Sequence, residues 1–565
     1  MDPGESRAPV RTVPLALGLL FGAWTTVRVF AGHPYLTVCS WIVSIGLLVG
    51  SFPAPSAATV KHPKWPRLRG IAFAAVVCLP TLVRLADIQP DRIHGDEILT
   101  GYFSATYDLR RTDFFAPVPA DPTVWVAQFP APYFVLQKLF FEMFGASLLT
   151  IKLSALPYVV VAGAMLFAIA RDLLDERAAA LAVVVYAFFA PSAYLDTLGV
   201  HFISSTAAFL VFFYFAVREL RHGLARDALL AGLSAGSCYL FYLSSYLALP
   251  LAIAFFFLRG ARRRERHVAR NMLIFSLGFI AVVAPFVARW AREPGVYLRR
   301  FEQVALLGGE WSPYRAGGSG AKVPPTDVVA QNLRLSLRSL HAAGVGGHGG
   351  YEFGKQALLG PLALALALAG VARAVALARR RSEWWLVIAT IVLAFLTGMV
   401  LTIPPPAFHR ASIAFPFLAL LISLPLHALI DLRIGRERAR YAVAAAILAG
   451  FIVTQRLDFL QAVLPEAESS PLRLARFIDA RFPDRPLYVA AFPSYLFEKL
   501  YHFAATGHAR AVTTGYHVDL LARLDPARKY VYVVTLPDQF ASQFASRDPH
   551  GRMIRFTEEF GLFVN

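Results

Sequence analysis

The sequence "IAFAAVVCLPTLVRLADIQPDRIHGDEILTG", residues 71–101, joins an apolar run directly to a pair of acids. The first part is long and apolar enough to cross a membrane as a helix. Asp96 and Glu97 follow close behind it, and charges so near to hydrocarbon cost free energy. The stretch therefore predicts a membrane protein whose polar chemistry lies at the end of a span.

The whole chain has the composition of a polytopic membrane protein. It has 565 residues, of which 57% are hydrophobic and 16% are charged, whereas soluble domains carry about 25% charged residues. The net charge of +18 lies in short loops between apolar runs, a pattern that orients membrane proteins. We therefore expect membrane lipids as partners and no nucleic acid. The three cysteines, Cys39, Cys78 and Cys238, lie inside apolar runs and indicate neither a disulfide framework nor a zinc site.

About thirteen segments have the length and apolarity of transmembrane helices. The first is interpreted as a retained span, although a cleaved signal peptide is the alternative. The segments are residues 13–31, 35–52, 70–87, 148–170, 178–195, 200–217, 227–242, 244–259, 271–290, 356–378, 383–403, 411–430 and 441–457.

Five connections between these segments are strongly basic, namely "KHPKWPRLR", "RELRHGLARD", "LRGARRRERHVAR", "ARRRSE" and "DLRIGRERAR". Counting spans places all five on one side, which the positive-inside rule assigns to the cytoplasm. Attraction to anionic lipid is compatible with the same pattern. The opposite side then holds the acidic pair, two long loops and the tail.

The chain divides into three predicted parts. Residues 1–60 form an N-terminal transmembrane hairpin, and residues 61–460 a transmembrane module with outer loops at 88–147 and 291–355. Residues 461–565 contain short strand-like runs alternating with helical ones, which predicts a small α/β domain outside the cytoplasm. We expect this tail to recognise an acceptor or a partner.

The loop 88–147 is predicted to contain two amphipathic helices that lie along the membrane surface. In the second, Tyr133, Leu136, Phe140 and Phe144 share one face, with Gln137, Lys138 and Glu142 mostly off that face.

The acidic pair is followed by "FPAPYFVLQKLFFEMFGASLLTIKLSALPY" and then by a series of spans. The motif positions in this run are Phe129, Pro130, Pro132, Tyr133, Phe144, Gly145, Lys152 and Leu153. This order of features resembles the GT-C class of membrane glycosyltransferases. It is most similar to the family 39-like branch, which contains protein O-mannosyltransferases and lipid A aminoarabinose transferases. The resemblance covers roughly residues 70–430, with a mild departure at Lys152, where arginine is usual.

The resemblance implies a polytopic α-helical GT-C fold and an inverting sugar transfer on the outer face of the membrane. The donor would be a sugar on a polyprenyl phosphate, and the acceptor a hydroxyl of a lipid, glycan or protein. The alanine- and arginine-rich composition suggests a bacterial inner membrane, with the site and the tail periplasmic or extracellular.

Asp96 and Glu97 are the candidate catalytic residues. The reaction needs a base for the acceptor's proton, which we assign to Asp96, with Glu97 positioning the acceptor, Asp96 or a metal. The alternative is structural, because an acid in the first turn of a helix stabilises it. His409 and Arg410, in "PPPAFHR", are the candidate donor-phosphate site, or an arginine that extends to the head groups.

Further substrate-binding candidates surround these residues. They are His94, Tyr102, Lys152, His201 and Tyr351. Tyr351 belongs to the loop 291–355, which we expect either to close over the donor or to serve as a linker. Asp196 and His201 fall at a turn that could face the site, although a structural histidine is the simpler interpretation. If a divalent metal ion takes part, Asp96 and Glu97 are its expected ligands.

Two other functions remain open on the sequence. One is a transporter or flippase of a lipid-linked sugar, although the spans carry few ionisable residues. The other is a non-catalytic membrane scaffold whose tail binds a partner.

Overall fold

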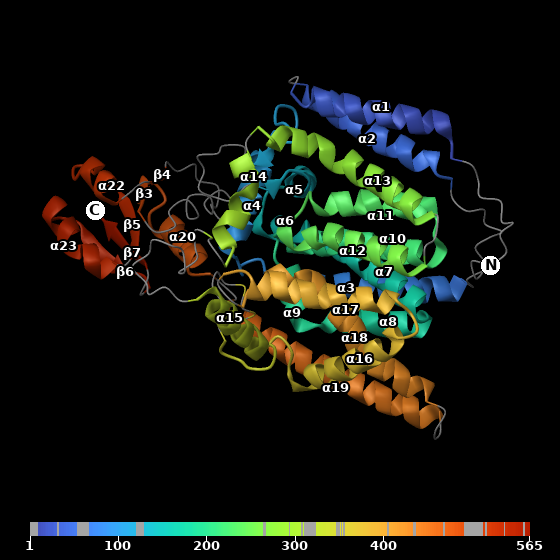
Figure 1. Ribbon diagram of the computed structural model, residues 1–565. Coiled ribbons are helices and arrows are strands. Elements are labelled where there is room, and N and C mark those ends of the chain that lie inside the picture. Colours follow the sequence, from blue (N-terminus) through green and yellow to red (C-terminus); the bar gives the residue numbers. More distant parts are fainter. Residues whose placement is uncertain are drawn as a thin grey trace.

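Helices dominate the computed structural model, which forms a bundle with a small domain projecting from one end (Figure 1). We call that end the domain end and the opposite one the basic end. The structure describes the chain apart from residues 1–9, 31–32, 54–66, 120–128, 264–266, 293, 307–308, 310–323, 346–350, 352, 354–355, 404–405, 433–436, 467–468, 491–511, 515–516, 536 and 558–559.

Nine helices of the described chain are long and apolar enough to cross a membrane. A tenth span results if α8 (Glu176–Phe188) and α9 (Ala190–Asp196), which meet at a 63° bend, are counted together. The nine are α2 (Pro34–Ser51), α3 (Arg67–Asp87), α6 with α7 (Leu148–Leu153 and Leu156–Leu173), α10 (Phe202–His222), α13 (His267–Trp290), α16 (Pro361–Ala378), α17 with η3 (Glu383–Phe395 and Leu396–Val400), η4 with α18 (Phe408–Ala414 and Phe415–Asp431) and α19 (Glu437–Val463).

Ten of the roughly thirteen predicted segments correspond to these nine helices and the bent pair, and the other three form shorter helices. These are α1 (Thr12–Arg28), α11 (Ala225–Cys238) and α12 (Ala248–Arg263), with 17, 14 and 16 residues. Helix α11 packs backbone to backbone on α13: a Cβ at Gly232 would lie 2.0 Å from the carbonyl oxygen of Phe275. Such close contacts between small residues hold membrane helices together.

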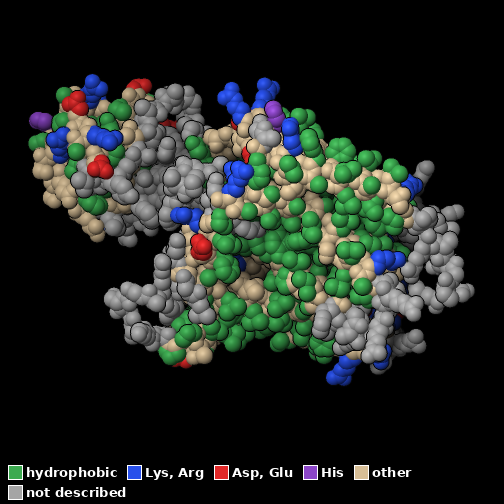
Figure 2. All heavy atoms as spheres, turned by 45° about the horizontal axis from the view of Figure 1, so that its top comes forward, with side chains coloured by type: hydrophobic (Ala, Val, Ile, Leu, Met, Phe, Trp, Pro, Cys, Tyr) green, Lys and Arg blue, Asp and Glu red, His purple; other side chains and the backbone are tan. Residues whose placement is uncertain are grey.

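The surface of the bundle agrees with a membrane location. Figure 2 shows hydrophobic side chains spread over its flank, with charged side chains at its margins and on the domain that projects from it. At the basic end, neighbouring connections contact one another: Arg221 pairs with Glu383, and Arg381 donates to the carbonyl of Leu173. The basic connections after α10 and α16 therefore share one end, as the count of spans predicts.

Several short elements cover the domain end. They are α4 (Gly95–Thr106), β1 (Pro117–Val118), β2 (Phe129–Pro130), α5 (Pro132–Phe144), η1 (Leu243–Leu247), α14 (Pro294–Val304) and α15 (Pro325–Ser339). Strands β1 and β2 pair antiparallel and bring the start of α5 back beside α4.

The tail is an α/β domain, as predicted. Its sheet has the order β4-β3-β5-β7-β6, parallel from β4 to β5 and antiparallel beyond. One of its helical runs, "SYLFEKLYHFAAT" at residues 494–506, lies outside the described residues. The elements are η5 (Leu464–Glu466), α20 (Ser470–Arg481), β3 (Leu487–Val489), β4 (Val512–Thr514), α22 (His517–Arg523), β5 (Val531–Thr535), α23 (Pro537–Arg547), β6 (Arg552–Arg555) and β7 (Phe560–Val564).

The tail domain shares a hydrophobic core with the helices at the domain end. Ile98 of α4 belongs to the same buried cluster as Leu472 and Ile478 of α20. At the edge of this contact, Arg476 forms a 2.6 Å ion pair with Asp91. The tail is thus packed directly beneath the acidic pair predicted from the sequence.

Candidate active site

The segment between α3 and α4 is fixed to the bundle by two arginines. Arg456 of α19 donates a 2.6 Å bond to Asp87 at the end of α3. Arg92 is buried, and its guanidinium lies 3.9 Å from the ring centre of Tyr194, a favourable cation–π distance. These contacts set the position at which α4 begins.

Helix α4 begins with a reciprocal cap formed by His94 and Glu97. The Nδ1 atom of His94 accepts a hydrogen bond from the Asp96 amide at 3.1 Å, and Glu97 Oε2 accepts one from the His94 amide at 2.9 Å. Such a capping box satisfies amides that lack a helical partner. The alternative interpretation, that an acid here only stabilises the start of the helix, therefore applies to Glu97, whose side chain takes part in the cap.

The second oxygen of Glu97 is also occupied. Glu97 Oε1 accepts from Lys152 Nζ at 2.8 Å and from the Gly199 amide at 2.7 Å. Both Glu97 and Lys152 are buried. A carboxylate held by a cation and two amides is fixed in place, so Glu97 is suited to positioning rather than to accepting a proton. Lys152 thus lies in the protein interior behind the candidate site, where its charge neutralises that of Glu97.

Asp96, by contrast, is half-buried, and its Oδ2 accepts a 2.8 Å hydrogen bond from the hydroxyl of Tyr351. Burial, together with the adjacent Asp96 carboxylate, raises the pKa of the Tyr351 phenol well above its ordinary value. The phenol therefore remains protonated at physiological pH and acts as a donor. Asp96 is left as the acid of the pair that can meet a substrate.

A cluster of rings connects Asp96 to the predicted phosphate site. Tyr351 stacks on His94, with 3.9 Å between ring centres, and lies 4.5 Å from the ring of His409. Phe202 completes the cluster, with its ring centre 5.0 Å from that of Tyr351. The structure thus brings together three residues predicted separately, from the acidic loop, the loop 291–355 and the turn before α18.

Arg410 follows His409 in the short helix η4 and is buried. Its Nη1 donates a 2.6 Å bond to the carbonyl oxygen of Ile403. This bond holds the guanidinium close to the start of α18.

Two further candidates differ in their relation to this ring cluster, since His201 adjoins it, with its ring centre 5.2 Å from that of Phe202. Tyr102 is six residues along α4 from Asp96, a rise of about 9 Å, and is half-buried beside Phe103. His201 is buried in a second row of rings, 4.4 Å from Phe129 and 4.9 Å from Tyr242. His201 therefore borders the site from below.

Gln137, predicted to lie mostly off the apolar face of α5, is buried at the centre of a polar network. Its Oε1 accepts from Ser104 at 2.7 Å, and its Nε2 donates to Ser154 at 3.0 Å and to the Gly199 carbonyl at 3.3 Å. The face of α5 that packs on protein is therefore rotated from the predicted one, and Phe144 is 62% exposed. Because both faces of α5 are largely apolar, periodicity alone did not distinguish them.

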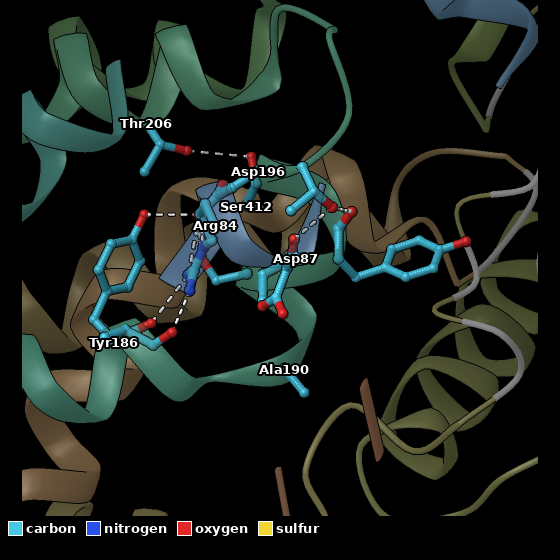
Figure 3. Close-up of polar contacts among 12 residues, drawn as sticks. Arg84, Asp87, Tyr186, Ala190, Asp196, Thr206 and Ser412 are labelled. Atoms are coloured by element: carbon cyan, nitrogen blue, oxygen red, sulfur yellow. Dashed lines mark hydrogen bonds and ion pairs between the residues drawn. The ribbon is translucent and has the colours of Figure 1, made fainter. Parts of the chain in front are cut away.

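A buried ion pair between Arg84 and Asp196 was also missed (Figure 3). Arg84 donates to the carbonyls of Tyr186 and Ala187, and Asp196 accepts from Tyr186 and Ser192. Carbonyls at a helix end need donors, and α8 ends here. Asp196 thus stabilises the bend between α8 and α9 and does not face the site; an arginine inside an apolar run was the available signal.

The contacts of Glu97 do not favour a metal ion at the acidic pair, because its oxygens accept from a lysine and two amides. Within the described chain, one group has metal-ligand spacing, formed by Asp175, His427 and Asp431. It lies at the other end of α8 and α18 from the site. Its His427 Nε2 is 2.9 Å from Asp175 and 3.4 Å from Asp431.

Comparisons with known proteins agree with this architecture. ArnT from Cupriavidus metallidurans, in its crystal structure bound to undecaprenyl phosphate, is similar with a TM-score of 0.54 and 13% identity, covering 87% of this chain and 97% of ArnT. The chain has the GT-C fold. The resemblance inferred from the sequence is thereby confirmed.

The other comparisons point the same way. Residues 130–290 match the model of the dolichyl-phosphate-mannose-protein mannosyltransferase family. The oligosaccharyltransferase of Archaeoglobus fulgidus, in the apo form, has a TM-score of 0.50 and 12% identity, covering 84% of this chain and 70% of that one. No curated protein matches the chain.

Proposed function

We propose that the protein is a glycosyltransferase that moves a sugar from a polyprenyl-phosphate donor to a hydroxyl of a lipid, glycan or protein. The observation that carries the proposal is the position of Tyr351, which donates to Asp96 and lies beside His409. One ring thus links the predicted base to the predicted phosphate site. The matched mannosyltransferase family and ArnT, whose crystal structure holds undecaprenyl phosphate, support the donor class.

In the proposed reaction, the acceptor oxygen attacks the anomeric carbon and the bond from that carbon to the phosphate oxygen breaks. Asp96 takes the proton of the acceptor hydroxyl, as a general base does. The polyprenyl phosphate leaves with the bonding electrons, and the positive charge of Arg410, with His409 beside it, offsets the charge that develops on it.

A single displacement fits the two acids. A double displacement needs one carboxylate as nucleophile and a second group as acid and base. Glu97 is buried and fully hydrogen-bonded, which leaves Asp96 alone to act. One displacement inverts the anomeric centre.

We place the site on the outer face of a bacterial inner membrane. The basic connections lie at the end of the bundle opposite Asp96, and positive residues favour the cytoplasm. The tail domain would then be periplasmic or extracellular, next to the site, where it can contact an acceptor.

The decisive experiment compares the cell-envelope lipids, polysaccharides and glycoproteins of a deletion strain by mass spectrometry. The strain carries wild type, Asp96→Asn or, as a control, Asp108→Asn, which changes an exposed acid beyond the end of α4. We expect a sugar that is absent in the deletion to return with wild type and Asp108→Asn. Asp96→Asn should lower transfer by about 100-fold to 10,000-fold.

Restoration by well-expressed Asp96→Asn would overturn the proposal and leave a scaffold as the interpretation. The transporter alternative is tested with purified protein in detergent. A transferase forms product there, whereas a transporter needs two compartments.

A further inference from the structure

A cavity of about 740 Å³ opens at the basic end of the bundle, between α10, α12 and α17. Helix α10 begins beside the ring cluster and runs for 21 residues to its end at His222, a length of about 30 Å. The cavity therefore lies across the membrane from Asp96 and belongs to a different site.

The lining of the cavity combines a hydrocarbon-like interior with a basic rim. Leu251 and Phe255 of α12 are buried, and Leu386 of α17 is half-buried. Arg379 and Arg380, in the connection from α16 to α17, are exposed. Ligand sites of 300–1,000 Å³ commonly have such apolar walls with a few charged groups.

The charges of the rim are unequally compensated. Arg221 pairs with Glu383 at 3.0 Å, and Arg381 donates to the carbonyl of Leu173 at 2.8 Å. For Arg379 and Arg380, the described part of the chain records no ion pair. Two adjacent positive charges repel each other, so an anion at the rim would be stabilised by both.

Trp385 indicates the depth of the cavity in the membrane. It contributes to the lining and is 46% exposed. Tryptophan is enriched where head groups meet acyl chains. A molecule bound here would have its head among the arginines and its tail among Leu251, Phe255 and Leu386.

We propose that this cavity binds one anionic phospholipid, with its phosphate on Arg379 and Arg380 and an acyl chain between α12 and α17. The inference does not depend on the proposed sugar transfer. It also differs from a general attraction of basic loops to the membrane surface, because it requires a cavity that can be filled.

The test is native mass spectrometry of the full-length protein in detergent, with phosphatidylglycerol, phosphatidylcholine or undecaprenyl phosphate added. Arg379→Gln/Arg380→Gln removes the positive charge of the rim. Ala254→Trp fills the cavity from an exposed lining position and leaves the charge of the rim unchanged. Arg373→Gln is the matched control, because Arg373 is exposed on α16 and lies outside the lining.

We expect wild type and Arg373→Gln to retain one phosphatidylglycerol, and both cavity variants to lose it by about tenfold or more. Equal retention by the control and Arg379→Gln/Arg380→Gln would overturn the proposal. So would equal retention of phosphatidylcholine by wild type, which would assign the cavity to neutral lipid. Preferential retention of undecaprenyl phosphate would assign it to a polyprenyl phosphate instead.

Discussion

Two buried ion pairs, Glu97–Lys152 and Arg84–Asp196, are similar in composition and different in position. Each acid is buried and accepts hydrogen bonds from several donors. The first pair lies directly behind Asp96, whereas the second is enclosed where α8 bends into α9. One therefore lies behind the proposed base and the other supports a broken helix.

The comparison also explains why two adjacent acids have different tasks. Glu97 points into the protein, where its carboxylate accepts hydrogen bonds from a lysine and two backbone amides. Asp96 is half-buried and meets the hydroxyl of Tyr351. The fixed acid sets the direction of its neighbour, because both lie in the first turn of α4.

The largest expected effect comes from breaking each pair in turn. Lys152→Met leaves Glu97 buried without its cation, and Arg84→Met does the same to Asp196. Each should cost about 3–5 kcal/mol in the free energy of unfolding, measured by unfolding in detergent. Only Lys152→Met should also abolish sugar transfer per folded molecule. Equal losses of transfer in the two variants would show that the pairs do not differ in function.

Gly199→Ala should have the next largest effect. A Cβ at Gly199 would lie 2.2 Å from Ile151 Cγ2 and 2.6 Å from its carbonyl oxygen. The backbone must then shift and weaken the amide bond to Glu97, for a cost of about 1–3 kcal/mol. Gly295→Ala is the control, because nothing lies within 4 Å of a Cβ there. Unchanged stability and transfer in Gly199→Ala would argue against this contact.

Tyr351 predicts a pH dependence. Its pKa is raised in the folded protein, so the folded state keeps a proton that the unfolded state releases above about pH 10. Its stabilising contribution is complete below that pH. It decreases by up to about 1.4 kcal/mol per pH unit above it. Other buried tyrosines contribute to the same decrease, so unfolding from pH 8 to 11 should show a steeper slope in wild type than in Tyr351→Phe.

The smallest effect should come from the exposed ion pair at the tail. Asp91 and Arg476 form a 2.6 Å contact, with side chains 43% and 45% exposed. Such pairs contribute less than about 1 kcal/mol. Asp91→Asn should therefore change the unfolding temperature and sugar transfer little. A loss of stability or transfer comparable to that of Lys152→Met would show that this contact contributes more than an exposed ion pair does.

The fold was largely predictable because long apolar runs alternate with short basic connections along the chain. The apolar runs predicted the spans, and the strand-like runs in the tail predicted its sheet. Three of the predicted segments form helices of 14 to 17 residues. The close packing of α11 on α13, where a Cβ at Gly232 would meet the backbone of Phe275, does not follow from hydropathy.

The site was predictable only in part. Asp96, Glu97, His409 and Tyr351 were candidates because they follow spans or lie in loops on one predicted side of the membrane, and the structure brings Asp96, Tyr351 and His409 together. The roles of Gly199 and Gln137 depend on contacts between segments far apart in sequence. Arg84 was visible as a charge in an apolar run, but its partners follow from a helix break that periodicity does not show.

The core shared by α4 and α20 sets the order in which the site is completed during synthesis. Ile98 and Leu472 belong to one buried cluster, yet a ribosome adding about 5–20 residues per second makes them about 20–75 s apart. Throughout that interval the underside of the helix that carries Asp96 lacks its partner. A nascent or truncated chain would therefore keep the apolar side chains on the underside of α4 uncovered until the tail is made and folded.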